Sequence, residues 1–550
     1  MENNPQDEGP RSSKAKLAVI AIVLIVIVAA VAVVVFEETA HKGPQKVTFY
    51  TWWATEGKIA VDKEYAAFHA AYPNLTAVSE LKAGAGGSAA KGAILSLIAD
   101  GNPPESFQTH YGPEMLSYIE AASGHSKAFV NMTSIADSMK NVVPQVLAAG
   151  TFNGSTFSLP VDAHRGAELY INPQLLYNNS IKELPQNVTA LLADSAKLKS
   201  NGIPGWTIPG GDGGWDQMQV WEDLLLANSI NMTGNAKIYD MALYGVLNTS
   251  TNSTVKNVVS LTNSEYLTAL SEENGSMSTY TWTKAIPSVT GSQSGFQANG
   301  NWYVNYAYDF LNVTAYPMNS STMNTTYDHQ HHINLIAMPF PGTNGYFALV
   351  TDSVAVPVGS HDQAGITFAK YFSSYAGQAV FTKWKASTFY NNITSPSFYN
   401  TPSQWGDYQA LLNASHNSSR FVYQLSDGGL FDSEASSFES ALQSFTSASK
   451  ESNWNSSLQS IMGSEESSWK TANSLGFGFM GTLAHPFGNY LPPWVSNSTS
   501  ASSSVSTASV NTSGAVQHSN DNGVPYSAVS FLVVLAGLMV IAPIYYERKR

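Results

Sequence analysis

Two long apolar runs, one near each end of the chain, most strongly limit how it can fold. Residues 17–36 contain only Leu, Ala, Val, Ile and a final Phe, and a run of this length can cross a membrane as a helix. Arg11, Lys14 and Lys16 precede it, so the positive-inside rule places residues 1–16 in the cytoplasm. We expect residues 17–36 to be a transmembrane helix or a retained signal anchor. A cleaved signal peptide is the alternative, although Glu38 makes the cleavage site around Ala40 a poor one.

The second apolar run covers residues 526–546 and is followed by Glu547, Arg548, Lys549 and Arg550. These basic residues again favour the cytoplasmic side, so we expect a transmembrane helix with residues 547–550 as a cytoplasmic tail. The preceding residues 496–525 are mostly Ser, Thr, Val, Ala and Asn without an apolar period, which is typical of a flexible stalk. Residues 45–495 would then form the working domain outside the membrane.

The composition excludes several classes of function. A net charge of −13 without a basic stripe argues against a nucleic-acid partner. The absence of cysteine excludes disulfides, thiol catalysis and Cys-type zinc sites. Only 12% of the residues are charged, and eighteen Asn-x-Ser/Thr sequons are spread along the chain. We therefore expect a glycosylated exterior, with an unmodified neutral polar surface as the alternative.

The start of the working domain has the pattern of an α/β fold. Residues 46–53 and 75–81 are rich in β-branched and aromatic residues and predict strands, whereas 58–71 and 89–100 predict helices. This β-α-β-α order indicates a mostly parallel sheet. The glycine-rich turn at 84–88 lacks the Gly-Lys-Ser/Thr of a P-loop, so we interpret it as a turn that leads into a helix.

Tryptophans next to glycine, asparagine and aspartate are the most informative chemical signal. Trp52 and Trp53 end a predicted strand, Trp215 follows Gly-Gly-Asp-Gly-Gly, and Trp302 follows Asn-Gly-Asn. An indole covers the C–H face of a sugar ring, while polar side chains bind its hydroxyls. These positions favour carbohydrate binding over core packing. His329 and His331, placed on one face of a strand, offer a weaker metal hypothesis, and we predict no metal site.

An ordered set of short motifs runs through the working domain, at residues 47–53, 68–73, 86–91, 101–104, 107–110, 159–165, 300–302, 340–343, 351–353 and 377–381. Together these motifs resemble a known family, the extracellular solute-binding proteins (family 1) of carbohydrate ABC transporters. The closest resemblance is to the glucose- and maltose-binding members, archaeal ones included. The sequence departs from the family's pattern at Asn301, at Glu168 and Tyr170, and at residues 385–388, which leaves the identity of the sugar open.

The resemblance implies a two-lobed periplasmic-binding-protein-like α/β fold with a ligand cleft between the lobes, flanked by the N- and C-terminal transmembrane helices. Lobe 1 would comprise about 45–160 and 345–400, and lobe 2 about 165–340 and 401–495. The protein would be a cell-surface receptor at the cell membrane, with its main domain on the extracellular face. It would carry a mono- or oligosaccharide to the permease subunits of an importer that also contains an ATPase. Such binding needs no catalytic residue and no cofactor.

The resemblance also assigns ligand-binding residues. These are Trp52, Trp53, Glu56, Gly87, Ser88, His110, Asp162, His164, Arg165, Trp215, Trp302 and Asp352. The indoles would stack on the sugar ring, the carboxylates would accept hydrogen bonds, and the histidines and Arg165 would donate them. Arg165 and Asp352 could instead simply tie the lobes together.

Two other functions stay open at this point. A surface glycoside hydrolase would need two carboxylates across a sugar cleft, for which Asp212, Asp216 and Glu222 are candidates. A sugar-binding sensor or adhesin that is not coupled to transport is the second alternative, and the two predicted anchors are compatible with it.

Overall fold

The computed structural model describes residues 24–25, 45–82, 87–122, 126–275, 279–359 and 362–476, together with Tyr490, Pro492 and Trp494. All of them belong to the first of two compact units, Met1–Ala501 and Ser502–Arg550. Apart from Leu24 and Ile25, the two predicted membrane spans and the stalk lie outside the described residues. Among the helices that were described, none is both long and apolar enough to cross a membrane.

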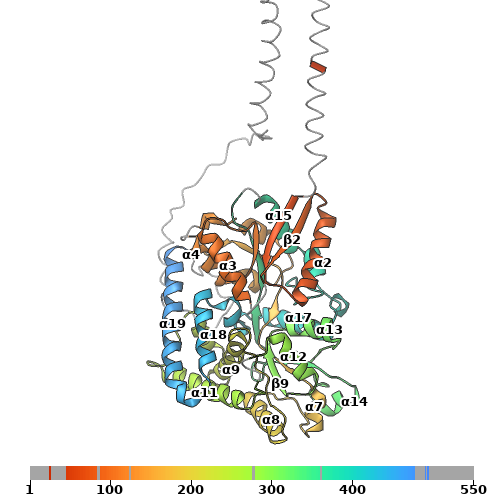
Figure 1. Cartoon of the computed structure of the whole chain (residues 1–550), viewed down its shortest axis with the longest axis vertical. Coiled ribbons are helices and arrows are strands. Elements are labelled where there is room, and N and C mark those ends of the chain that lie inside the picture. The colour runs from red at the N-terminus through yellow and green to blue at the C-terminus, as the bar shows by residue number, and fades with distance from the viewer. Residues whose placement is uncertain are drawn as a thin grey trace, which may run out of the picture. The chain divides into compact units, whose positions relative to one another are not determined.

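The first lobe is built on a five-stranded sheet (Figure 1). Its strands, in spatial order, are β2 (Leu75–Leu81), β1 (Gln45–Thr51), β3 (Ser106–His110), β13 (Asp352–Ala355) and β6 (Ser158–Pro160). β1 runs parallel to β2 and β3, as the β-α-β-α pattern predicts, but β13 pairs antiparallel with both β3 and β6. Because β6 is antiparallel to β13, it runs in the same direction as β1, β2 and β3. The expectation of a mostly parallel sheet therefore holds for the strand directions, with β13, which reaches the sheet from the other lobe, as the reversed strand.

Seven helices surround this sheet, and α2 and α3 flank it in Figure 1. They are α2 (Glu56–Ala71), α3 (Ser88–Ala99), α4 (Glu114–Ala121), α5 (Thr133–Ser138), α6 (Pro144–Ala149), α15 (Asp362–Phe372) and α16 (Tyr375–Phe381). A small hairpin, β4 (Thr151–Phe152) with β5 (Ser155–Thr156), lies before β6.

The second lobe contains a four-stranded sheet with β10 (Tyr316–Pro317), β11 (Ile336–Pro339), β8 (Glu168–Ile171) and β9 (Phe296–Asn299) in this order. Its helices are α7 (Pro173–Asn178), α8 (Val188–Ser200), α9 (Trp215–Thr233), α10 (Lys237–Leu243), α11 (Ser253–Ser271), α12 (Trp282–Thr290), α13 (Trp302–Leu311), α14 (Thr325–Gln330), α17 (Pro402–Ser415), α18 (Asp432–Ser444) and α19 (Glu451–Ser474). The 24-residue helix α19 lies beside α18 in Figure 1.

A third, three-stranded sheet joins the lobes. It contains β14 (Phe421–Tyr423), β12 (Phe347–Val350) and β7 (His164–Arg165). The chain passes between the lobes from β6 to β7 and from β12 to β13, and residues 385–388 run beside the first of these connections. Ala163 and Ser387 exchange backbone hydrogen bonds of 2.8 and 3.1 Å, and the Val161 N–H donates to the Asp352 carbonyl at 2.8 Å. The connections between the lobes are thus hydrogen-bonded to one another.

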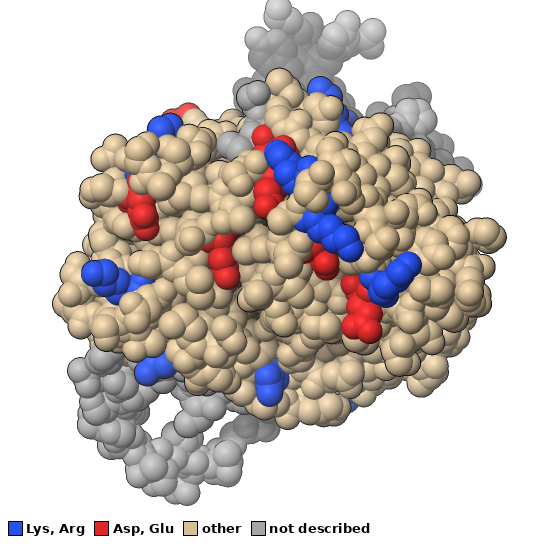
Figure 2. Space-filling view, turned by 90° about the horizontal axis from the view of Figure 1, so that it is seen from below, with Lys and Arg blue, Asp and Glu red and all other residues tan. Residues whose placement is uncertain are grey.

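The outer surface carries few charges. Figure 2 shows one face, on which Lys, Arg, Asp and Glu are scattered over a mostly uncharged surface. The sequon asparagines among the described residues lie on the outer surface. None of them is buried, and all except the half-buried Asn274 and Asn455 are exposed.

An aromatic cluster between α2, α15 and the first sheet holds lobe 1 together. The ring centroid of Phe368 lies 5.4 Å from that of Phe49, 5.3 Å from that of Phe68 and 5.5 Å from that of Phe372. All four side chains are completely buried. Contacts at these distances combine apolar burial with favourable edge-to-face geometry.

We predict that Phe368→Ala lowers the free energy of unfolding by about 3–5 kcal/mol, because it removes a buried ring and leaves a cavity. Urea unfolding followed by circular dichroism measures the effect. The matched control is Phe310→Ala on α13, where the ring is 50% exposed and we expect a change within about 0.5 kcal/mol. Equal effects of the two substitutions would contradict this description of the core.

Candidate functional site

A cavity of about 220 Å³ lies between the lobes. Lobe 1 contributes the segment after β1, the residue before α3 and the end of β3. Lobe 2 contributes the starts of α9, α12 and α13, and the connections between the lobes contribute His164, Val350, Asp352 and Lys385. Strand ends and helix starts therefore meet at one place, which is the usual position of a ligand site in open α/β sheets.

Most of the predicted site residues line this cavity. They are Trp52, Trp53, Glu56, Gly87, His110, His164, Trp215, Trp302 and Asp352. Ser88, Asp162 and Arg165 do not. Whether the lining residues bind a ligand stays a prediction, but the structure brings them together from segments up to 300 positions apart in the sequence.

The three other residues have different surroundings. Ser88 is the first residue of α3 and is exposed. Asp162 lies behind His164, and Arg165 faces away from the cavity because neighbouring residues of a strand point to opposite sides. The Arg165 guanidinium donates to the Tyr346 carbonyl at 3.4 Å and lies 3.9 Å from Glu168. Of the two residues suspected of tying the lobes together, Arg165 thus contacts both Tyr346, just before β12, and Glu168 of β8, whereas Asp352 lines the cavity.

Two stacked indoles form one wall of the cavity. The ring centroids of Trp215 and Trp302 are 5.6 Å apart at an interplanar angle of 27°. Trp302 also packs edge-on against His164 at 5.2 Å, and its ring lies so close to Gly300 that a side chain at that position would collide with it. The Trp215 Nε1–H donates to Asp427 at 2.9 Å, while Trp302 Nε1 has no partner among the described residues. This wall therefore offers an apolar face and a free N–H donor.

The other two predicted indoles differ in exposure. Trp52 packs against Gly87, whose φ of +94° and lack of a side chain make room for the ring. Trp52 also lies 5.5 Å from the Lys91 ammonium and 5.3 Å from the His110 ring. Trp53 is only 4% exposed, and its ring packs among phenylalanines of the lobe 1 core. Trp52 is therefore better placed than Trp53 to present a ring face to a ligand.

His110 faces carboxylates on both sides. Its Nδ1 lies 2.7 Å from Glu114, which also pairs with Lys91 at 2.8 Å. Its Nε2 lies 3.9 Å from both Asp352 and Asp427. Burial, the largest single influence, lowers the pKa of His110, but the charge and hydrogen bond of Glu114 together with the charge of Asp352 raise it overall. His110 thus lies with Nδ1 against Glu114 and with Nε2 on the side of the cavity carboxylates.

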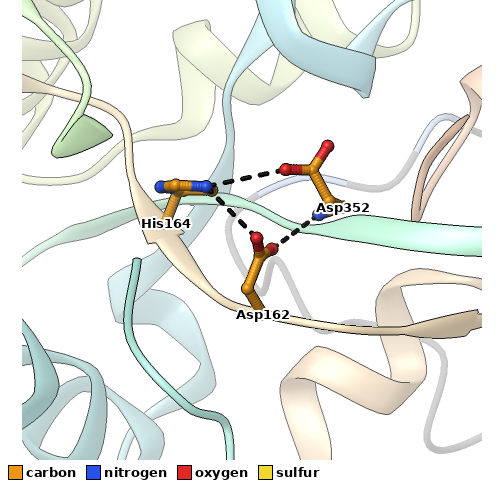
Figure 3. A group of neighbouring side chains, drawn as sticks. All are labelled: Asp162, His164 and Asp352. Carbon is orange, nitrogen blue, oxygen red and sulfur yellow. Dashed lines mark hydrogen bonds and ion pairs between the residues drawn. The ribbon is translucent and has the colours of Figure 1, made fainter. Parts of the chain in front are cut away.

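The connections between the lobes carry a second group of ionisable side chains (Figure 3). His164 Nε2 lies 3.3 Å from Asp162 and 3.6 Å from Asp352, and the Asp352 backbone N–H donates to Asp162 at 2.8 Å. Burial and the Lys385 cation lower the pKa of His164, but the two carboxylates raise it overall to about 9. The pKa of Asp352 is lowered despite its burial, through His164 and Lys385.

Asp162, His164 and Asp352 also have the residue types and spacing that could hold a metal ion. The other ring nitrogen of His164, Nδ1, lies 2.6 Å from the side-chain oxygen Oδ1 of Asn301, which can only accept, so Nδ1 carries a proton. With its pKa at about 9, His164 is protonated on both nitrogens at neutral pH and has no lone pair to offer a cation. We therefore interpret the group as an imidazolium between two carboxylates.

The weaker metal hypothesis rested on an incorrect secondary structure. His329 lies in α14 and His331 follows it, rather than both lying on a strand. Each imidazole ring stacks on a tyrosine ring. The ring centroids are 4.1 Å apart for His329 and Tyr177, and 3.9 Å apart for His331 and Tyr327. A strand had been expected because the histidines alternate, but the Asn324 side chain caps a helix here by accepting from the Thr326 N–H.

The departures from the family pattern lie together beside the cavity. Asn301 accepts from His164 and donates to Asp407 at 3.1 Å. The Tyr170 hydroxyl donates to Glu168 at 2.7 Å and to the Gly300 carbonyl at 3.0 Å, and its ring stacks on Tyr303 at 3.8 Å. These three residues thus form a layer that supports His164 and Trp302.

Several lining residues were missed by sequence reasoning. They are Ala54, Thr55, Asp212, Thr281, Trp282, Thr283, Val350, Lys385 and Asp427. Asp212 had been considered only as a catalytic carboxylate. Asp427 precedes Gly428 and Gly429, so the reasoning that found Trp215 after its glycine loop could have found it. Lys385, 3.6 Å from Glu56, lies in the segment that departs from the family pattern.

The three carboxylates considered for hydrolysis have different partners, and among them Asp212 lines the cavity whereas Asp216 and Glu222 do not. Asp212 lines the cavity and accepts from the Trp282 N–H at 2.6 Å, whereas Asp216 is buried and accepts from Asn299 at 3.1 Å. Glu222 accepts from the Leu425 N–H at 2.6 Å and from the Ser426 hydroxyl. Glu222 thus holds the loop that carries Asp427.

Comparison with known sequences agrees with this geometry. The family described as bacterial extracellular solute-binding protein matches residues 54–379. The glucose-binding protein GlcS of Saccharolobus solfataricus is 42% identical over 457 residues, covering 82% of this chain and 79% of that protein. An uncharacterized ABC transporter extracellular-binding protein of Pyrococcus horikoshii is 26% identical over 352 residues, covering 62% and 71% of the two chains.

Solved structures share the fold at low sequence identity. The bacterial solute receptor AcbH has a TM-score of 0.57 at 16% identity, covering 78% of this chain and 99% of its own. A chitin oligosaccharide binding protein has a TM-score of 0.59 at 13% identity, covering 78% and 100% of the two chains. The chain belongs to the extracellular solute-binding protein family and is a two-lobed sugar-binding receptor of the ABC-transporter type, not an enzyme.

The raised pKa of His164 predicts a pH-dependent stability. Because the folded-state pKa of about 9 exceeds the ordinary 6.5, the ion pairs stabilise fully below pH 6.5, and this contribution is lost as the pH rises through 9. We expect the difference in unfolding free energy between wild type and His164→Gln to fall by up to about 3 kcal/mol over that interval. Urea unfolding from pH 5 to pH 10 measures it, and a difference independent of pH would rule out a charged His164.

Proposed function

We propose that this protein captures a hexose of the glucose type in the cleft between its lobes and delivers it to the permease of an ABC importer. The observation that carries the proposal is the composition of the cavity. Stacked indoles and a group of carboxylate and imidazole side chains line the same cavity. An apolar face opposite a ring of donors and acceptors suits a pyranose, which has C–H faces and hydroxyl edges.

The roles of the lining residues follow from their contacts. The Trp215–Trp302 wall would cover one ring face, and Trp52 would approach from lobe 1. Asp352 and Asp427 would accept from sugar hydroxyls, and His110 and Lys385 would donate to them. The glucose-binding relative supports a glucose-type ligand over other neutral solutes.

Delivery to a transporter would use the connections between the lobes. Ligand contacts on both sides stabilise the closed arrangement of such a protein, and closure occurs by hinge motion at a few residues between the lobes. We propose that the closed, sugar-bound form is the one that the permease recognises, with the ATPase in the same complex.

We also propose that the receptor is held at the cell surface by the apolar segments 17–36 and 526–546, with residues 496–525 as a stalk. Glycosylation of the exposed sequon asparagines is part of the same proposal. Glycans would hydrate a surface that has few charges, as the mostly uncharged face in Figure 2 illustrates.

A sensor or adhesin that binds sugar without transport is the second candidate, favoured by the two predicted anchors. The two functions differ in one phenotype. Deletion of the gene reduces sugar uptake if the protein serves an importer, and leaves uptake unchanged if it is a sensor or adhesin.

Thermal unfolding of the purified full-length protein against monosaccharides and disaccharides tests the binding proposal. A ligand that binds the folded state raises the melting temperature by mass action, and we expect D-glucose at millimolar concentration to do so. Trp302→Ala should abolish the rise because it removes the ring face and the free N–H. Trp384→Ala, a half-buried indole outside the cavity that lies under Lys63, is the matched control and should retain the rise. No rise with any sugar would contradict the proposal.

A further inference from the structure

Several hydrogen bonds and ion pairs behind the cavity converge on one side chain, Asp407 of α17. Its Oδ2 accepts from the Asn301 Nδ2–H at 3.1 Å, and its Oδ1 lies 4.0 Å from the Arg165 guanidinium. Asp407 is buried and does not line the cavity. It can therefore act on the site only through the residues that it contacts.

Asp407 holds strand β7 from both of its faces. His164 and Arg165 are consecutive in this strand, so their side chains point to opposite sides. On one side Asp407 faces Arg165 directly. On the other side it is linked through Asn301, whose Oδ1 lies 2.6 Å from His164 Nδ1. The backbone closes this ring of contacts, because the Asn301 N–H donates to the Arg165 carbonyl at 2.9 Å.

The contact with Asp407 decides how the amide group of Asn301 is oriented. A carboxylate only accepts hydrogen bonds, so Nδ2 of Asn301 must lie on its side. The amide oxygen then faces His164, where it accepts from Nδ1–H. The tautomer and charge of a histidine follow from the hydrogen bonds at its two nitrogens. Asp407 therefore favours His164 protonated on Nδ1, with Nε2–H left for its two ion pairs (Figure 3).

Glu168 keeps Asp407 in its accepting, ionised form. The two carboxyl groups are hydrogen-bonded to each other, which requires a proton on one of them. Burial and then the charge of Asp407 raise the pKa of Glu168 well above its usual range. Burial also raises the pKa of Asp407, but the hydrogen bond from Glu168 and the charge of Arg165 oppose that rise. The proton thus lies on Glu168, and Asp407 is the carboxylate. The titratable groups that interact with this pair include Arg165, His164, Tyr170 and Tyr399.

We propose that Asp407 is a positioning residue for sugar binding. Through Asn301 it keeps His164 protonated, and this imidazolium orients the Asp352 carboxylate at the cavity. The inference rests on the proposed function, in which Asp352 accepts a hydrogen bond from the sugar. Without Asp407 the Asn301 amide can turn and present Nδ2–H to the ring, which disfavours a proton on Nδ1. Asp352 then loses its cationic partner.

The pH at which His164 loses its charge tests this link without a ligand. It is the midpoint of the pH-dependent difference in unfolding free energy between a protein and its His164→Gln derivative. Urea unfolding of the full-length protein from pH 5 to pH 10 measures it. We expect Asp407→Asn to lower the midpoint by about one pH unit or more from its value near 9. Asp194→Asn, which alters a half-buried carboxylate of α8, is the matched control and should leave the midpoint unchanged.

Exchanging the two side chains separates positioning from a general loss of stability. In the double variant Asn301→Asp/Asp407→Asn a carboxylate faces His164 and an amide lies behind it, so Nδ1–H keeps an acceptor. We expect the midpoint to return to the wild-type value or above. Asn301→Ser removes the amide and should lower the midpoint as Asp407→Asn does, and it replaces Asp407→Asn if that variant does not fold.

Isothermal titration calorimetry with D-glucose over the same pH range connects the charge to binding. We expect the affinity of the wild type to decline as the pH approaches 9, and that of Asp407→Asn to decline about one pH unit lower. The double variant should bind as the wild type does.

The other results decide against the proposal in different ways. A midpoint that Asp407→Asn does not move, or that the double variant does not restore, overturns the positioning role and leaves the proposed function intact. A midpoint that moves while glucose affinity is independent of pH overturns the connection to binding. Failure of glucose to bind contradicts the proposed function and the role in sugar binding, whereas the midpoints still decide whether Asp407 sets the charge of His164.

Discussion

The ion pairs of His164 with Asp162 and Asp352 are the interaction on which the rest of the site depends. They join two of the connections between the lobes at the point where the cavity begins. Asp162 is bound on both sides, by the Asp352 N–H and by the imidazolium, so it contacts the connections between the lobes rather than the cavity, and its role in ligand binding stays a prediction. Asp352 in turn accepts from Gln108 of β3 at 2.7 Å and still faces the cavity. The same ion pairs therefore join the connections between the lobes and place charged groups at the cavity.

The two walls of the cavity are built by different physical means. The aromatic wall depends on glycines, because Gly300 admits the ring of Trp302 and Gly214, with a φ of +99°, precedes Trp215 at the start of α9. The polar wall depends on buried partners: Glu114 orients His110, and Glu222 holds the loop of Asp427. A buried carboxylate that accepts several backbone and hydroxyl hydrogen bonds is costly to remove. The supporting residues are thus as important to the site as those that line it.

Much of the fold and of the cavity could be predicted from the sequence, for reasons that are local. β1, α2, β2 and α3 lie within two residues of their predicted ends, because β-branched runs, helical periodicity and the Pro and Gly boundaries agree there. Trp215 and Trp302 were recognised as candidate site residues because each follows a loop segment rich in Gly, Asn or Asp. The family resemblance then indicated which segments, far apart in the sequence, meet at the cleft between the lobes.

What could not be predicted depends on tertiary pairing. The family resemblance assigned both His164 and Arg165 to the ligand, and the two-residue strand β7 has no alternating pattern that could show which of the two lines the cavity. The antiparallel strand β13 returns from the other lobe, and no local signal marks that return. Asp427 and Lys385 reach the cavity from segments far along the chain, and no local pattern marks them as lining residues.

A crystal structure of the protein grown with D-glucose tests the central claim most directly, since it locates the ligand without reference to affinity. The account predicts electron density for one pyranose in the cavity, with a ring face against Trp302 and a hydroxyl hydrogen-bonded to Asp352. A sugar bound elsewhere, or a cavity without sugar at a saturating concentration, would contradict it.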